Sequence, residues 1–187
     1  VTGTAVTDGL TVAGNVSVDG GTIKLDGNYP TGTGNVALGD GALDDASLSG
    51  NSNTAIGSTA LSAHTTGANN TAVGRYALES NSTASNNTAV GLASLQNNTT
   101  ANSNSAFGYA ALDANTTGAL NVAVGANALG TNVTGGNNTA VGTNALFDNT
   151  ASNNTAVGKD ALANNTTGIG NVAVGQATLD ANTTANY

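Results

Sequence analysis

Side chains that could carry acid–base, nucleophilic or metal chemistry are scarce in this sequence of 187 residues. It contains one histidine, His64, no cysteine and 11 acidic residues. The absence of cysteine excludes disulfides and thiolate metal sites within the chain. A Ser-His-Asp arrangement would have to use His64, which stands in a predicted turn with no nucleophile-elbow motif. We therefore predict no catalytic residues and a protein that is not an enzyme.

The carboxylates show a regular pattern, because four of them recur at one position in a repeated unit: Asp44, Glu79, Asp113 and Asp180. If each unit forms one coil of a stack, like charges on adjacent coils would lie under about 5 Å apart and repel each other. No two of these four carboxylates stand in adjacent units, which avoids that repulsion. At about 10 Å, carboxylates on alternate coils are too far apart to share a calcium ion, whose ligands lie at about 2.3–2.6 Å. Asp40, Asp44 and Asp45 form a denser group, which is the alternative metal candidate. Our prediction is no metal and no cofactor.

These residues are positioned by a unit that opens with Asn and occurs nine times: Asn35, Asn53, Asn70, Asn87, Asn104, Asn121, Asn138, Asn154 and Asn171. The spacing is 17 residues, with one interval of 18 and one of 16. With the Asn as position zero, every unit has Ala at position two, an apolar residue at position three, Gly at position four and Leu at position eight. So short a fixed period predicts a solenoid in which each unit is one coil.

Each unit predicts two short strands joined by turns. Positions zero to four alternate polar and apolar residues and end at a Gly, which is typical of a strand followed by a turn. Positions six to nine, such as 76–79, are predicted to form a second strand, with a short helix as the alternative. Positions ten to sixteen are rich in turn residues. The predicted fold is an all-β parallel β-solenoid of nine coils over residues 35–187, preceded by a β connector or cap over residues 1–34.

Side chains alternate along a strand, so positions one and three lie on one face and positions zero, two and four on the other. If the residues at positions three and eight fill the coil, the predicted core includes Val73, Leu78, Val90, Leu95, Val124, Leu129, Val141 and Leu146. The Ala at position two would then point outward and pack against another chain: Ala55, Ala72, Ala89, Ala106, Ala123, Ala140, Ala156 and Ala173. The alternative is a narrow interior lined by Ala, with Val facing out.

Position eleven is Asn in seven consecutive units: Asn81, Asn98, Asn115, Asn132, Asn149, Asn165 and Asn182. Identical amides stacked about 4.8 Å apart can hydrogen-bond along the column. His64 occupies the same position in an earlier unit, which favours a ladder or capping role for its imidazole over catalysis.

Charge and hydropathy limit the classes of partner. The net charge is −8 with Lys24, Arg75 and Lys159 as the cations, which gives no electrostatic footprint for nucleic acid. No apolar run approaches the ~20 residues that span a bilayer, so we expect no membrane insertion in this segment. Few apolar side chains are available to each coil, so an isolated chain is expected to be marginally stable and an oligomer is favoured.

The unit, written Asn-Thr-Ala-Val-Gly at residues 70–74 and Asn-Thr-Ala-Ile-Gly at 53–57, resembles the head repeat of trimeric autotransporter adhesins (the YadA-like head). It is similar also to repeats of phage tail fibres, and residues 21–30 leading into 35–39 look like the fibre proteins of marine and cyanobacterial phages. This resemblance implies a left-handed parallel β-roll with three chains side by side, in an extracellular, cell-surface or virion rod. The period is longer than is usual in the adhesin heads, which leaves the cross-section open.

The predicted function is a structural and adhesive fibre module that binds a host-surface receptor or glycan, with subunits that stack end to end as a variant. One alternative is an ice-binding solenoid that uses the threonines at position one: Thr54, Thr71, Thr88, Thr139 and Thr155. Val36, Ser105, Val122 and Val172 interrupt that column. The other alternative is a phage fibre that degrades polysaccharide, which would need a carboxylate cluster in a groove between chains.

Overall fold

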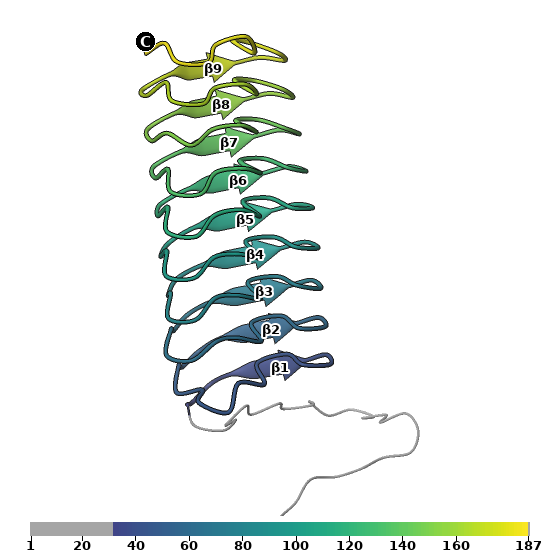
Figure 1. Cartoon of the computed structure of the whole chain (residues 1–187). Helices are drawn as coiled ribbons and strands as arrows, with labels where there is room; N and C mark the ends of the chain where they lie inside the picture. Colours follow the sequence, from purple (N-terminus) through teal and green to yellow (C-terminus); the bar gives the residue numbers. More distant parts are fainter. Residues whose placement is uncertain (1–31, 187) are drawn as a thin grey trace, which may run out of the picture.

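The computed structural model describes residues 32–186 as a rod of stacked coils (Figure 1). Each coil contributes one three-residue strand, and we number the coils by their strands: β1 (Val36–Leu38), β2 (Thr54–Ile56), β3 (Thr71–Val73), β4 (Thr88–Val90), β5 (Ser105–Phe107), β6 (Val122–Val124), β7 (Thr139–Val141), β8 (Thr155–Val157) and β9 (Val172–Val174). They form one parallel sheet in sequence order. The predicted all-β parallel solenoid is confirmed. The proposed connector at 1–34 lies almost entirely outside the described residues.

The sheet register aligns equivalent positions of successive coils. Ala72 pairs with Ala89 and Val73 with Val90, for example, and every other strand pair follows the same rule. The rule also holds between β1 and β2, where the repeat is 18 residues, and between β7 and β8, where it is 16. Changes in repeat length are therefore absorbed by the turns, and the strands stay aligned.

The predicted second strand at positions six to nine is wrong, because this segment is a series of turns. The Leu at position eight has φ between 49° and 53° in all nine coils, and position six is also left-handed, as at Tyr76 with φ 63°. A left-handed residue reverses the chain direction and cannot continue a strand. The helical alternative is also wrong, since the described part of the chain contains no helix. Burial of the Leu side chain offsets the cost of about 1–3 kcal/mol for this backbone conformation.

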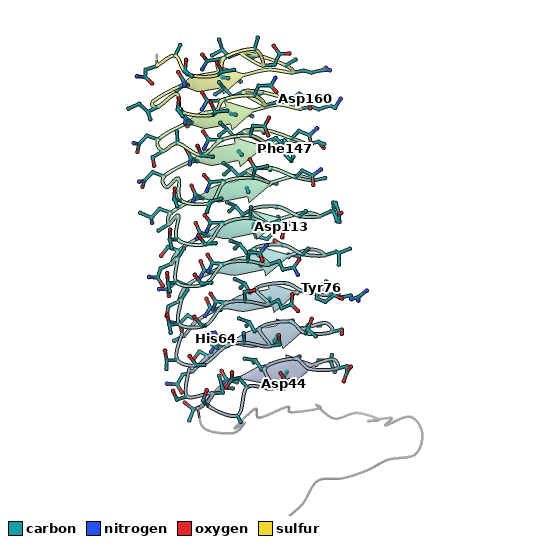
Figure 2. The ribbon with its side chains drawn as sticks, in the orientation of Figure 1. Asp44, His64, Tyr76, Asp113, Phe147 and Asp160 are labelled. Atoms are coloured by element: carbon teal, nitrogen blue, oxygen red, sulfur yellow. The ribbon has the colours of Figure 1, made fainter. Side chains whose placement is uncertain are left out.

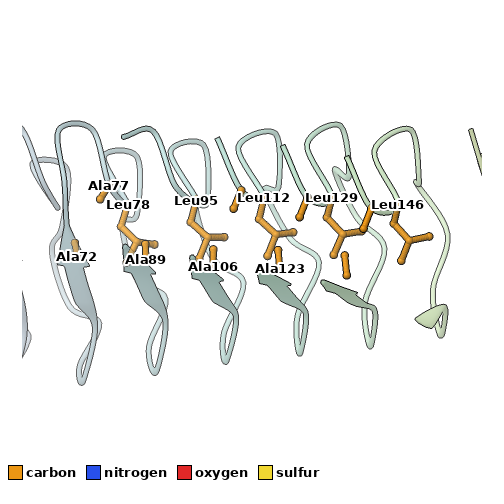
Figure 3. Packing of buried hydrophobic residues seen from close by; sticks show 14 of the residues in the cluster. Ala72, Ala77, Leu78, Ala89, Leu95, Ala106, Leu112, Ala123, Leu129 and Leu146 are labelled. Atoms are coloured by element: carbon orange, nitrogen blue, oxygen red, sulfur yellow. The ribbon is translucent and has the colours of Figure 1, made fainter. Parts of the chain in front are cut away.

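The core is a column of one Leu and two small residues per coil (Figure 3). Leu78, Leu95, Leu129 and Leu146 are fully buried, as predicted. In coils 2 to 9 the Ala at position two is also buried, and in most coils an Ala at position seven belongs to the same core, as Ala72 and Ala77 show. The interior is thus narrow.

Two predictions about the strand faces are therefore wrong. The position-three residues Val73, Val90, Val124 and Val141 are not core residues, because they lie on the outer face of the sheet. The proposed interchain alanines point into their own coil and are at most 1 % exposed: Ala55, Ala72, Ala89, Ala106, Ala123, Ala140, Ala156 and Ala173. The reason is that the Asn at position zero is itself buried, and alternation places position two on the same face.

Candidate functional site

An asparagine ladder runs through the buried interior at position eleven. Asn98 Nδ2 donates to Asn81 Oδ1 at 2.8 Å, and Asn115 Nδ2 donates to Asn98 Oδ1 at 3.0 Å. The second amide hydrogen stays within its own coil, where Asn98 Nδ2 donates to Ala101 O at 3.1 Å. These side chains are buried, so the amides are consumed in holding the coils together and are unavailable to a ligand.

A second asparagine ladder, which the sequence does not predict, runs along position zero. Asn70 Oδ1 accepts the backbone N–H of Asn87 at 3.0 Å, and Asn87 Oδ1 accepts that of Asn104 at 2.9 Å. Asn87 Nδ2 donates to Ala101 O at 2.9 Å, the carbonyl that also receives Asn98 Nδ2. The sequence carries a signal for this ladder, since position zero is Asn in all nine units.

The imidazole of His64 takes the place of an amide in the position-eleven ladder. Its Nε2 lies 2.7 Å from Gly67 O, and its Nδ1 lies 2.9 Å from Asn81 Nδ2. The tautomer that satisfies both contacts donates from Nε2 to Gly67 and accepts from Asn81 at Nδ1. The ring is fully buried and both nitrogens are engaged. His64 is thus placed as a structural ladder residue, in agreement with the predicted role.

The position-eleven ladder is interrupted at the 16-residue repeat. In coil 7 the turn after Asn149 is one residue shorter, and Asn149 Nδ2 donates to Ala151 O at 2.8 Å, two residues on. In coil 6 the matching bond from Asn132 spans three residues, to Gly135 O. Asn132 Oδ1 is consequently buried without a hydrogen-bond partner. The ladder resumes beyond the gap, where Asn165 Nδ2 donates to Asn149 Oδ1 at 2.8 Å.

The carboxylates are not assembled into a cluster. Glu79 and Asp113 are separated by Gln96, whose Nε2 donates to Glu79 Oε2 at 2.6 Å. Burial raises the pKa of Asp113, the direction expected of a carboxyl that loses solvent. Hydrogen bonds from Ser47 lower the pKa of Asp45. Among the described residues no group of three or more His, Cys, Asp or Glu is placed to hold a metal ion.

The outer face of the sheet is an exposed surface with two rows of side chains. Position three is apolar in every coil, and its exposed fraction reaches 69 % at Val174 and 41 % at Phe107. Position one is Thr, Ser or Val. No charged residue lies in either row. We call these two rows the sheet face; it is a continuous uncharged surface along the rod.

The remaining described surface is mostly polar with a few exposed apolar side chains, such as Leu120 and Ile169, and it has no concave site. No pocket is found among residues 32–186, and no helix there is long and apolar enough to cross a membrane. Side chains project along the whole length of the rod, as the stick view shows (Figure 2). The structure thus offers extended surfaces in place of a single cavity.

Comparisons with protein-family models, with curated proteins and with solved structures found no match to this chain. The likeness of its repeat to adhesin heads and phage fibres stays a prediction from the sequence.

Proposed function

We propose that this chain is a non-enzymatic fibre module: a stiff rod that spaces and presents binding surfaces outside a cell or on a virion. The observation that carries the proposal is the unbroken register of nine coils, each joined to the next by strand pairing and by buried asparagine bonds. Nine strands at about 4.8 Å span about 38 Å along the axis. Such a rod repeats its surface chemistry, and weak contacts made at many coils add together.

We propose further that three copies associate side by side through the sheet face, each in the left-handed β-roll that the resemblance implies. An apolar row that repeats at the coil spacing is matched along its length only by a surface with the same repeat, and a second copy in parallel has that repeat. Large exposed apolar patches mark interaction sites in soluble proteins. The proposed surface between chains is therefore the sheet face and not the row of position-two alanines, which is buried within each coil from coil 2 to coil 9.

The test is the mass of the protein in solution together with electron micrographs. We expect a particle of three times 17.9 kDa that appears as a rod. The double variant Val90→Asp with Val124→Asp places two charges in the sheet face and should lower the mass to that of one chain. Thr100→Asp is the matched control, because Thr100 is exposed at position thirteen, away from the sheet. A wild-type protein that stays monomeric at micromolar concentration would contradict the assembly.

Ice binding is the second candidate function, and one observation favours it. The threonines at position one, including Thr71, Thr88 and Thr139, face outward at the regular strand spacing, beside the row at position three. Val122 and Val172 interrupt this hydroxyl array, which is why we rank it second. A thermal-hysteresis measurement decides between the two. Ice-growth inhibition that is lost in Thr71→Asp with Thr88→Asp would favour this candidate over the fibre module.

A further inference from the structure

The coils differ most at position five, the residue that follows the Gly after each strand. Six of the nine coils have a small residue, a polar residue or Lys there: Asp40, Ser58, Ala126, Thr143, Lys159 and Gln176. Coils 3, 4 and 5 instead have Arg75, Leu92 and Tyr109. Leu92 is 44 % exposed and Tyr109 57 %. Since the fold accepts Ser or Ala at this position, the large side chains are not needed for packing.

These three residues form one column on the surface. The backbone N–H of Ala93 donates to Arg75 O at 3.0 Å, and that of Ala110 donates to Leu92 O at 3.0 Å, which stacks the three position-five residues on successive coils. Tyr76 joins them beside Arg75, and Figure 2 shows it at the edge of the rod. We call Arg75, Tyr76, Leu92 and Tyr109 the corner patch. It contains two of the four aromatic side chains in the described part of the chain.

Arg75 is an exposed cation, and among residues 32–186 no carboxylate pairs with it. Its guanidinium lies 4.3 Å from the centre of the Tyr76 ring and donates to the Tyr76 hydroxyl. Lys159, the other cation in residues 32–186, is paired with Asp160 at 3.1 Å. In a chain of net charge −8, the corner patch is therefore the place within the described residues where an anionic group would find a fixed and unpaired positive charge.

We propose that the corner patch binds a linear acidic polysaccharide. Successive sugars of an extended pyranose chain repeat at close to the spacing between coils, so neighbouring rings can lie on Leu92 and Tyr109 while a carboxylate meets Arg75. An extended peptide rises about 3.3 Å per residue and does not keep step with coils about 4.8 Å apart. Exposed Tyr and Arg side chains are the types that dominate binding energy at protein surfaces. This inference rests on the proposed role of the rod in binding surfaces.

The experiment measures binding of the intact protein to immobilised alginate, a linear polyuronate, with hydroxyethylcellulose as the neutral polymer and poly-L-glutamate as the acidic peptide. Arg75→Gln copies the residue present at Gln176, and Tyr109→Ser copies Ser58, so both variants keep a side chain that the fold already accepts. We expect each to weaken alginate binding by at least about tenfold. Lys159→Gln is the matched control and should bind as the wild type does.

Four outcomes would overturn the proposal: no binding of the wild type to alginate, equal binding to poly-L-glutamate, equal binding to hydroxyethylcellulose, or the same loss in Lys159→Gln as in Arg75→Gln. Particle mass and rod shape are measured on the same samples. If the rods assemble and bind cells while alginate binding is absent, the polysaccharide site fails and the fibre function stands. If no rods or assemblies form, it is the fibre function that fails.

Discussion

Coils 3 to 6 and coil 7 differ by one residue in the turn after position eleven, and the two regions respond differently at the sheet and in the interior. The strands keep their register through coil 7, where Thr139 pairs with Thr155. The position-eleven amide ladder is broken there, since Asn132 Oδ1 has no hydrogen-bond donor. The sheet is thus insensitive to turn length, whereas the ladder depends on the turn to aim each amide at the next coil.

The largest expected effect comes from the Gly at position four, and it should be the same in both regions. A Cβ on Gly91 (φ 136°) would lie 2.3 Å from Gly108 O, and one on Gly142 (φ 135°) 2.5 Å from Gly158 O. Replacing either by Ala should destabilise the protein by at least about 3 kcal/mol. Thermal unfolding followed by circular dichroism measures this. Gly41→Asn is the control, because Asn127 and Asn144 already occupy its position; a large loss there would contradict the argument.

Removing an amide of the position-eleven ladder should destabilise the protein by different amounts in the two regions. Asn98 makes three side-chain hydrogen bonds along the ladder and within its coil, so Asn98→Ala should cost about 2–4 kcal/mol. Asn132 makes two, because its Oδ1 is unpartnered, and Asn132→Ala should cost about 1 kcal/mol less. Denaturant unfolding of the two variants side by side gives the difference. Equal losses would mean that the interruption has no energetic consequence.

Restoring the missing turn residue should repair the ladder. Insertion of a Thr between Thr150 and Ala151 makes the turn of coil 7 equal to that of its neighbours and lets Asn149 reach Asn132 Oδ1. We expect a gain of about 1 kcal/mol, seen as a higher midpoint of thermal unfolding. The control is the same insertion between Thr116 and Thr117 in a regular turn, which should lower the midpoint. A loss of stability from the first insertion would show that the short turn is the better fit.

Two carboxylates should give the smallest effects, with opposite signs. Burial raises the pKa of Asp113 in coil 5, so its ionised form disfavours the fold. Asp113→Asn should therefore stabilise the protein slightly at neutral pH, by well under about 1 kcal/mol because the group is part exposed. This advantage should shrink as the pH falls through the raised pKa and vanish below the usual Asp value of 3.8. Unfolding midpoints measured as a function of pH test this.

Asp160 behaves in the reverse way. Hydrogen bonds from Asn144 of coil 7 and from Lys159 lower its pKa, so its ionised form supports the fold. Asp160→Asn should reduce stability at neutral pH. The deficit should disappear as the pH falls from 3.8 through the lowered pKa, where the wild-type carboxyl also becomes protonated. Matching pH profiles for the Asp113 and Asp160 variants would contradict both assignments.

Much of the fold follows from the repeat in the sequence, but the inward face of the strand does not. The period predicts the coil, Leu78 and its equivalents in coils 1 to 8 are buried, and the strand lies where the alternation places it. Alternation defines two faces without saying which one is inside. The apolar character of Val73 predicts that it points inward, whereas the deciding residue is Asn70, a polar side chain whose hydrogen bonds are made within the rod. The left-handed Leu has no sequence signal, because its conformation is fixed by tertiary packing.

Strand pairing and the position-zero asparagines join each coil to the one stacked on it, and the position-eleven ladder adds to these bonds where it is unbroken. A load that pulls whole coils apart is shared by all the bonds of one junction, including those that water cannot reach. A load applied to one end of the chain instead peels that junction open a bond at a time. The same rod should accordingly resist tension spread over its cross-section far better than tension on a single strand of its backbone.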